Sequence, residues 1–268
     1  LYGAPTNKSL GEYWFESKID TIKEDKNARS CFIYGYFNPF ANKIVEVLKT
    51  RVYKENDPDY WEPSRPISRY GMEKIDYKNE LTKEERRYRS KTRWNAINKE
   101  FIYLDFRHEA LSAYDKFFYC TSLNSLSSAF KSKKDFIRRY SKNIRKAIDE
   151  NLSDYSIYQN KRIIENKVLN PRAVACVSNI LGKKYSSIRI ITHTFYTSEP
   201  AKTILLSSDN CDSYSEAFAG TGEFSIVCLV DAVLDASAKS LVLLDEPEVS
   251  IHPYAQQKLM EFLLQQIL

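Results

Sequence analysis

The segment with the clearest chemistry is residues 240–253, SLVLLDEPEVSIHP. Four apolar residues, Leu241 to Leu244, predict a strand buried on both faces, and Asp245 and Glu246 follow it directly. Ligands of α/β folds bind at the carboxyl ends of strands, so both carboxylates are expected at a ligand site. Asp245 stands where a carboxylate can support Mg²⁺, and Glu246 can polarise water that attacks a phosphate. A simple strand-ending turn would explain Asp-Glu-Pro alone but not the whole segment.

A second segment, upstream of that strand, has the composition of a phosphate contact. Ala219-Gly220-Thr221-Gly222-Glu223 is predicted to form a loop before a helix at residues 224–234. Small residues let the backbone approach a phosphate, and the first amides of the helix supply donors and a positive dipole end. A helix-capping glycine turn is the alternative for this segment taken alone. Its place before the Asp-Glu-Pro strand favours the phosphate contact.

These segments resemble motifs of the ABC ATPase superfamily. Residues 241–246 resemble the Walker B strand and catalytic glutamate, and residues 219–223 resemble the ABC signature. Residues 250–253, Ser-Ile-His-Pro, resemble the D-loop, which often reads Ser-Leu-His-Pro in the branch with SMC, RecF and OLD-type ATPases and many prokaryotic defence ATPases. The signature resemblance has one departure, because the serine of the family aligns with Gly220; Thr221 could supply the hydroxyl.

The resemblance implies specific roles for these residues. Asp245 would support Mg²⁺, and Glu246 would be the general base or the residue that positions water. The ATP bound to an opposing subunit would contact Gly220, Thr221, Gly222 and Glu223. The loop that touches that subunit would contain Ser250 and His252. No G-x-x-x-x-G-K-[ST] phosphate loop occurs in the 268 residues, so we expect that loop before Leu1 and the switch histidine after Leu268.

The function implied is ATP binding and hydrolysis, with Mg²⁺, that drives head-to-head dimerisation. The branch also implies control of an effector, a nuclease or toxin, in prokaryotic antiphage defence. Two alternatives remain: a DNA-repair or recombination ATPase of RecF or SMC type that binds DNA directly, and a non-catalytic scaffold with an ATPase fold.

The elements around these motifs predict an α/β fold with a mixed or parallel core sheet. Strands are expected at residues 31–37, 43–53, 101–106, 186–196, 202–208 and 240–244, a loop at 57–66, and helices at 82–100, within 111–149, at 172–183 and from 253 onward. This pattern divides an ABC head into three parts. They are an N-terminal part with an antiparallel β-subdomain (1–106), a helical lobe (107–185) and a part with signature, Walker B strand and D-loop (186–268).

The charge distribution and the cysteine content narrow the possible binding partners and the cellular compartment. Residues 1–150 hold 30 basic and 22 acidic side chains, and residues 151–268 hold 10 and 13. The basic run at 131–146 is therefore a candidate nucleic-acid surface, although a solvated helix or a partner-binding surface is favoured. Five cysteines without a CxxC pair favour a reducing compartment. No apolar run reaches the ~20 residues of a membrane span, so we expect a cytoplasmic protein.

Overall fold

The computed structural model describes residues 15–21, 29–75, 80–97, 99–106, 111–122, 126, 128–157, 159–208 and 211–267. The chain is mixed α/β and forms two compact units. The first contains Leu1–Phe101 and Ala238–Leu241, and the second contains Ile102–Ser237 and Val242–Leu268. Across the described residues, no helix combines the length and the apolar composition that a bilayer crossing requires.

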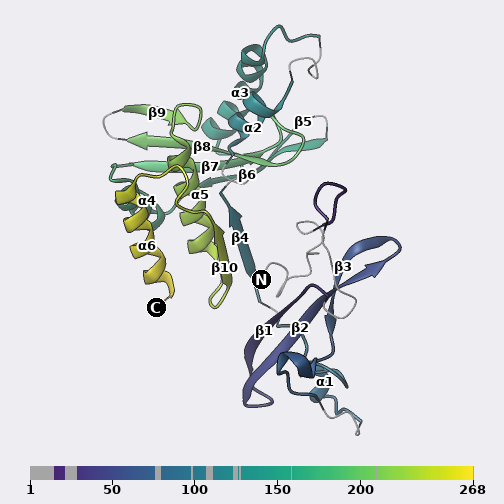
Figure 1. Cartoon of the computed structure of the whole chain (residues 1–268). Coiled ribbons are helices and arrows are strands. Elements are labelled where there is room, and N and C mark those ends of the chain that lie inside the picture. Colours follow the sequence, from purple (N-terminus) through teal and green to yellow (C-terminus); the bar gives the residue numbers. More distant parts are fainter. Residues whose placement is uncertain are drawn as a thin grey trace. The chain divides into compact units, whose positions relative to one another are not determined.

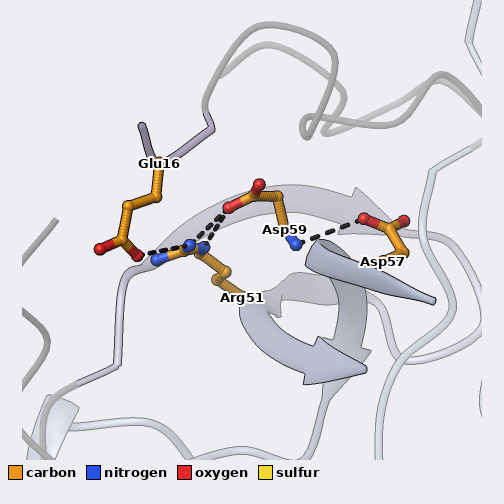
Figure 2. Close-up of polar contacts among 4 residues, drawn as sticks. All are labelled: Glu16, Arg51, Asp57 and Asp59. Atoms are coloured by element: carbon orange, nitrogen blue, oxygen red, sulfur yellow. Dashed lines mark hydrogen bonds and ion pairs between the residues drawn. The ribbon is translucent and has the colours of Figure 1, made fainter. Parts of the chain in front are cut away.

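The first unit contains an antiparallel sheet in the order β1 (Cys31–Asn38), β2 (Lys43–Lys54), β3 (Asp57–Ser64). The antiparallel pairing of β1 with β2 confirms the first two predicted strands. Arg51 of β2 is buried, and its Nε donates to Asp59 Oδ1 of β3 at 3.0 Å. Figure 2 shows the Arg51 guanidinium between Asp59 and Glu16, with its Nη2 3.5 Å from Glu16 Oε2. This ion pair joins the two strands inside the unit.

Strand β3 contradicts the loop predicted at residues 57–66. Its sequence, DPDYWEPS, contains Pro58 and Pro63, which cannot donate to a strand ladder. β3 lies at the edge of its sheet, and prolines are tolerated on an edge strand, where the missing N–H can face away from the partner strand. The prolines therefore mark an edge strand.

The helix predicted at residues 82–100 is also wrong over most of its length. Only a short helix, α1 (Glu85–Tyr88), forms beyond η2 (Ser68–Tyr70). At Arg89 the backbone becomes extended, with φ −148° and ψ 156°. Ser90 Oγ then accepts hydrogen bonds from the backbone of Thr92 and Arg93, at 3.3 and 3.2 Å. A serine side chain that bonds to nearby backbone in this way competes with the helical pattern.

The second unit contains a five-stranded sheet of consecutive antiparallel strands. Their order is β5 (Tyr155–Ile157), β6 (Asn160–Val168), β7 (Ser187–His193), β8 (Ala201–Ser208), β9 (Cys211–Ser215). The strands predicted at residues 186–196 and 202–208 are confirmed as β7 and β8, which pair antiparallel as a hairpin. Strands β5 and β6 were not predicted and lie within the sequence expected to form a helical lobe. β5 has only three residues, and β6, NKRIIENKV, is strongly polar, so neither has a clear strand signal in the sequence.

Helices cover both faces of this sheet (Figure 1). One face packs with α4 (Pro171–Leu181), α5 (Thr221–Asp235) and α6 (Pro253–Ile267), through Ile188 and Ile190 of β7. The other packs with α2 (Ala113–Cys120) and α3 (Lys133–Asp149), through Ile191. Alternating side chains of one strand thus enter two separate apolar cores.

Two further strands, β4 (Phe101–Asp105) and β10 (Leu241–Asp245), pair with each other. Leu241 N donates to Glu100 O at 3.0 Å and Phe106 N donates to Asp245 O at 3.2 Å, so both strands run in the same direction. Among the described strands, only this pair is parallel. Parallel pairing, predicted for a mixed or parallel core sheet, is therefore limited to β4 and β10, and the five-stranded sheet is antiparallel. Both strands are half-buried, whereas β10 was predicted to be buried on both faces.

Candidate functional site

The carboxylate of Asp245 lies at the carboxyl end of β10, where the sequence predicted a ligand site. Leu104 and Leu244 pack against the core formed with α4, α5 and α6. Side chains alternate along a strand, so Tyr103 and Asp245 project from the opposite face. There the Tyr103 hydroxyl donates to Asp245 Oδ2 at 3.0 Å. The parallel register of β4 with β10 thus orients the carboxylate.

Beyond β10, the backbone of Glu246 and Ser250 is strained. Glu246 has φ +52° and Ser250 has φ +65°, in the left-handed region that non-glycine residues rarely occupy. Each such conformation costs roughly 1–3 kcal/mol and persists only where the surroundings impose it. Between them, Val249 N donates to Glu246 O at 3.1 Å, closing a tight turn. Strained residues concentrate at functional sites, and these two are the predicted catalytic glutamate and the first residue of the predicted D-loop.

The signature-like segment forms the start of α5. Gly220 is the N-cap, with φ −68° and ψ 151°, and the helix begins at Thr221. The loop predicted over residues 219–223 is therefore too long, because Thr221, Gly222 and Glu223 form the first helical turn. The first N–H groups of a helix have no acceptor within the helix, so an anion at this point would find donors. Thr221 is exposed at this end.

The two predicted motifs meet at Gly222. A Cβ built on Gly222 would lie 2.5 Å from Ser250 O and 2.9 Å from Cγ2 of Ile251. Real side chains do not approach backbone so closely, so only glycine fits here. The first turn of α5 and the loop after β10 are consequently packed backbone to backbone. The spacing of the two motifs in the sequence does not predict this contact.

Glu223 is turned inward and bound by four donors. Its Oε1 accepts from Lys183 Nζ at 2.9 Å, Tyr185 Oη at 2.5 Å and Tyr214 Oη at 3.1 Å, and its Oε2 accepts from Gly220 N at 2.9 Å. Burial opposes ionisation of Glu223, but the donors outweigh it and keep the pKa of its carboxyl below the ordinary value. The carboxylate therefore caps α5 and fixes its first turn. Lys183, Tyr185 and Tyr214 were not predicted as site residues, since they come from other elements and show no local motif.

His252 lies exposed at the entry of α6. Its Nδ1 accepts from Tyr254 N at 3.3 Å, and its carbonyl accepts from Gln256 N at 3.0 Å. Gln256 Nε2 also donates to Ile251 O at 3.2 Å. These bonds connect the predicted D-loop to the first turn of α6 and leave the imidazole at the surface.

The residues at the end of β10 fit one kind of metal site. Mg²⁺ is usually held by one or two carboxylates together with substrate phosphates and water. Within the described ranges, no group of three or more His, Cys, Asp or Glu side chains could cage a metal ion. Asp245 is a single carboxylate at this position, the type of ligand that a nucleotide-bound Mg²⁺ ion would use.

A buried hydrogen-bonded chain on the α2–α3 side of the sheet was not predicted as functional. His193 Nε2 lies 2.9 Å from Thr203 Oγ1, which donates to Glu216 Oε1 at 2.9 Å. Ile204 N donates to Glu216 Oε2 at 3.0 Å. Burial raises the pKa of Glu216 to about 7 and lowers the pKa of His193 to about 4. His193 is the last residue of β7.

Comparisons of the chain with protein-family models, with curated proteins and with solved structures find no match.

Proposed function

We propose that this chain is part of an ABC-type ATPase that hydrolyses ATP between two head domains. The observation that carries the proposal is the backbone contact between Gly222 and Ser250. It joins the start of α5, which resembles the ABC signature, to the loop that resembles the D-loop. Both motifs thus come together as one surface, although 28 positions separate these two residues in the sequence.

Each residue at this surface has a distinct task in the proposed reaction. The first turn of α5, from Gly220, would offer its amides to the terminal phosphate held by an opposing subunit. Asp245, oriented by Tyr103, would support Mg²⁺, which neutralises charge on the phosphates when bound. Glu246 would orient or deprotonate the attacking water. Ser250 and His252 would contact the opposing subunit, and Glu223 would keep the first turn of α5 in place from within.

The phosphate loop of this ATPase would lie outside the 268 residues, since no such motif occurs in them. The proposal includes a homodimer formed around ATP. It also includes control of an effector, a nuclease or toxin, a role supported only by the resemblance to defence ATPases.

Substitution of Glu246 tests the proposal. Glu246→Gln keeps the size and one acceptor but removes the base, so hydrolysis should slow by about 10²-fold or more while ATP binding persists. The protein should then accumulate as an ATP-bound dimer. Asp245→Asn should instead weaken Mg²⁺-ATP binding and give no trapped dimer. Single-turnover hydrolysis and size-exclusion chromatography with ATP, on the polypeptide that includes the phosphate loop, measure both effects.

Glu248→Gln is the matched control, because Glu248 is an exposed acid of the same loop. It should hydrolyse ATP at the wild-type rate. A wild-type rate for Glu246→Gln would exclude the catalytic assignment. Absence of any ATP binding by the wild-type protein would favour the scaffold alternative.

A further inference from the structure

A long groove lies between α3 and the β8–β9 end of the sheet in the second unit. It has a volume of about 950 Å³. Its α3 wall runs from Lys134 to Asp149, which is about 22 Å of helix at 1.5 Å per residue. Leu205 and Thr203 of β8 form part of its floor, and the turn from Ser215 to Phe218 forms the opposite side. This length suits an elongated occupant such as a helix.

The groove lining is mainly apolar. Ile137, Ile144 and Ile148 of α3 face Leu205 across it, and Phe218 at its mouth is 87% exposed. Four aromatic residues, Tyr114, Phe118, Tyr196 and Phe218, also line it. Ile137, Ile144 and Ile148 recur at helical i, i+7 and i+11 spacing along α3, which matches the apolar stripe of an amphipathic helix laid in a groove. This aliphatic row favours a polypeptide, and the test below includes a nucleic acid as the competing occupant.

A cationic row borders this apolar lining. Lys134, Arg138 and Lys142 are exposed and lie four residues apart, so they follow one another along the same side of α3. Arg138 has a weak partner in Asp135, at 3.8 Å. Among the described residues, no ion pair engages Lys134 or Lys142. The row therefore presents positive charge to an occupant.

Other charges of the groove are already balanced within the chain. Arg145 pairs with Asp149 at 2.8 Å, and Lys146 approaches Glu150 at 4.0 Å. Glu216 also lines the groove, but its two oxygens accept from Thr203 and Ile204. The net unbalanced charge at the rim is consequently positive.

We propose that this groove is a docking site for an acidic amphipathic helix of a partner protein. Its apolar stripe would fill the groove, and acidic side chains four residues apart would pair with Lys134, Arg138 and Lys142. The groove borders Phe218, two residues before the N-cap of α5, but the docking itself requires neither ATP nor the proposed catalysis.

The test uses fluorescein-labelled peptides of about 16 residues, the length of helix that spans the groove. A panel carries leucines at helical i, i+3, i+4 and i+7 spacing in several registers, with glutamates four residues apart. Comparison peptides have lysine in place of each glutamate or serine in place of each leucine. A single-stranded oligonucleotide of similar length is the nucleic-acid probe. Fluorescence anisotropy with the 268-residue chain, without ATP, measures affinity.

We expect glutamate peptides to bind and both comparison peptides to bind more weakly. The triple variant K134E/R138E/K142E should lose roughly tenfold in affinity for the glutamate peptide and gain affinity for the lysine peptide, because three exposed ion pairs together contribute about 1–2 kcal/mol. A misfolded protein could not show that reversal. Arg139→Glu is the control, since Arg139 lies on α3 over the Phe130 ring and outside the groove lining.

Three results would overturn the proposal. The first is no binding by any glutamate peptide at millimolar concentration, and the second is equal binding of glutamate and lysine peptides. The third is oligonucleotide binding that the triple variant abolishes while the peptides fail, which would assign this face to nucleic acid. Loss of ATP hydrolysis in other experiments would leave these outcomes unaffected.

Discussion

His193 and Glu216 affect stability in opposite directions as pH changes. The folded-state pKa of His193 is lowered from 6.5 to about 4, so its contribution is complete above pH 6.5 and falls as pH decreases towards 4. The folded-state pKa of Glu216 is raised from 4.5 to about 7, so its contribution is complete below pH 4.5 and falls as pH rises towards 7. Between pH 4.5 and 6.5 the two slopes oppose each other.

Replacing either residue should therefore expose the pH dependence of stability that the other one contributes. Relative to the wild type, the unfolding free energy of Glu216→Gln should rise by about 2 kcal/mol between pH 5 and pH 7.5, because the wild-type protein loses about that amount through Glu216 over this range. Urea denaturation at both pH values measures the change.

His193→Gln supplies the complementary measurement. As pH rises from 4.5 to 6.5, its unfolding free energy should fall more steeply than that of the wild type, because His193 no longer offsets the loss through Glu216. Parallel pH profiles for the wild type and both variants would show that the buried chain does not titrate as described.

At single residues, prediction from sequence succeeds where chemistry is local. The strand-ending position of Asp245 follows from four apolar residues before it, and the structure has that strand end. Tyr103 could not be found in this way, because its contact with Asp245 depends on the parallel register of β4 and β10. The inward orientation of Glu223 likewise depends on donors from distant elements. The catalytic roles stay predictions.

Among the elements, α5 and the loop after β10 depend on two glycines that look alike in sequence. Gly222 has no room for a side chain, while a Cβ on Gly220 would meet nothing closer than Glu223 Oε2 at 4.0 Å. In the resemblance to the ABC signature both are simply small residues, whereas in the structure only Gly222 has to be glycine.

Gly222→Ala should destabilise the protein by about 1–3 kcal/mol, because its methyl group would force Ser250 and Ile251 away from α5. Gly220→Ala should change stability by less than about 1 kcal/mol. Thermal unfolding of both variants tests the difference. If both alanines are equally tolerated, the close contact between α5 and this loop does not exist in solution.

The helix predicted at residues 172–183 lies within two residues of α4, Pro171–Leu181, at each end. Asn170 Oδ1 accepts from Ala173 N at 2.8 Å at the start of α4, and Gly182 ends it with φ +64°. Capping of this kind acts within one helical turn, so such boundaries depend on local sequence. Strand β3 could not be predicted, because its prolines are compatible with a strand only at the edge of a sheet.

Over the whole molecule, the division into two units implies separate stabilities. Local cooperative units can open with different free energies, according to the contacts within each. The first unit contains the Arg51–Asp59 ion pair, and the second contains both apolar cores of the five-stranded sheet. Damage to one unit should then be visible mainly in that unit.

Arg51→Ala is expected to leave Asp59, only 16% exposed in its side chain, without its buried partner. Loss of one member of a buried pair costs about 3–5 kcal/mol. Hydrogen exchange followed by mass spectrometry should therefore speed up in β1, β2 and β3. Exchange in β7 and α5 should stay at the wild-type rate. Equal acceleration in all five elements would mean that the chain unfolds as one cooperative body.

The strand order of the second unit also determines the order in time in which its parts can fold. β5 to β9 each pair with a neighbour along the chain, and such local pairings lose little loop entropy and form early. Tyr103 and Asp245, in contrast, are 142 residues apart. During synthesis, which proceeds from the N-terminus, the five-stranded sheet can assemble before β10 exists. A nascent chain stopped before residue 241 would carry that whole sheet while lacking Asp245 and Glu246, so the acidic edge matures only after the five-stranded sheet.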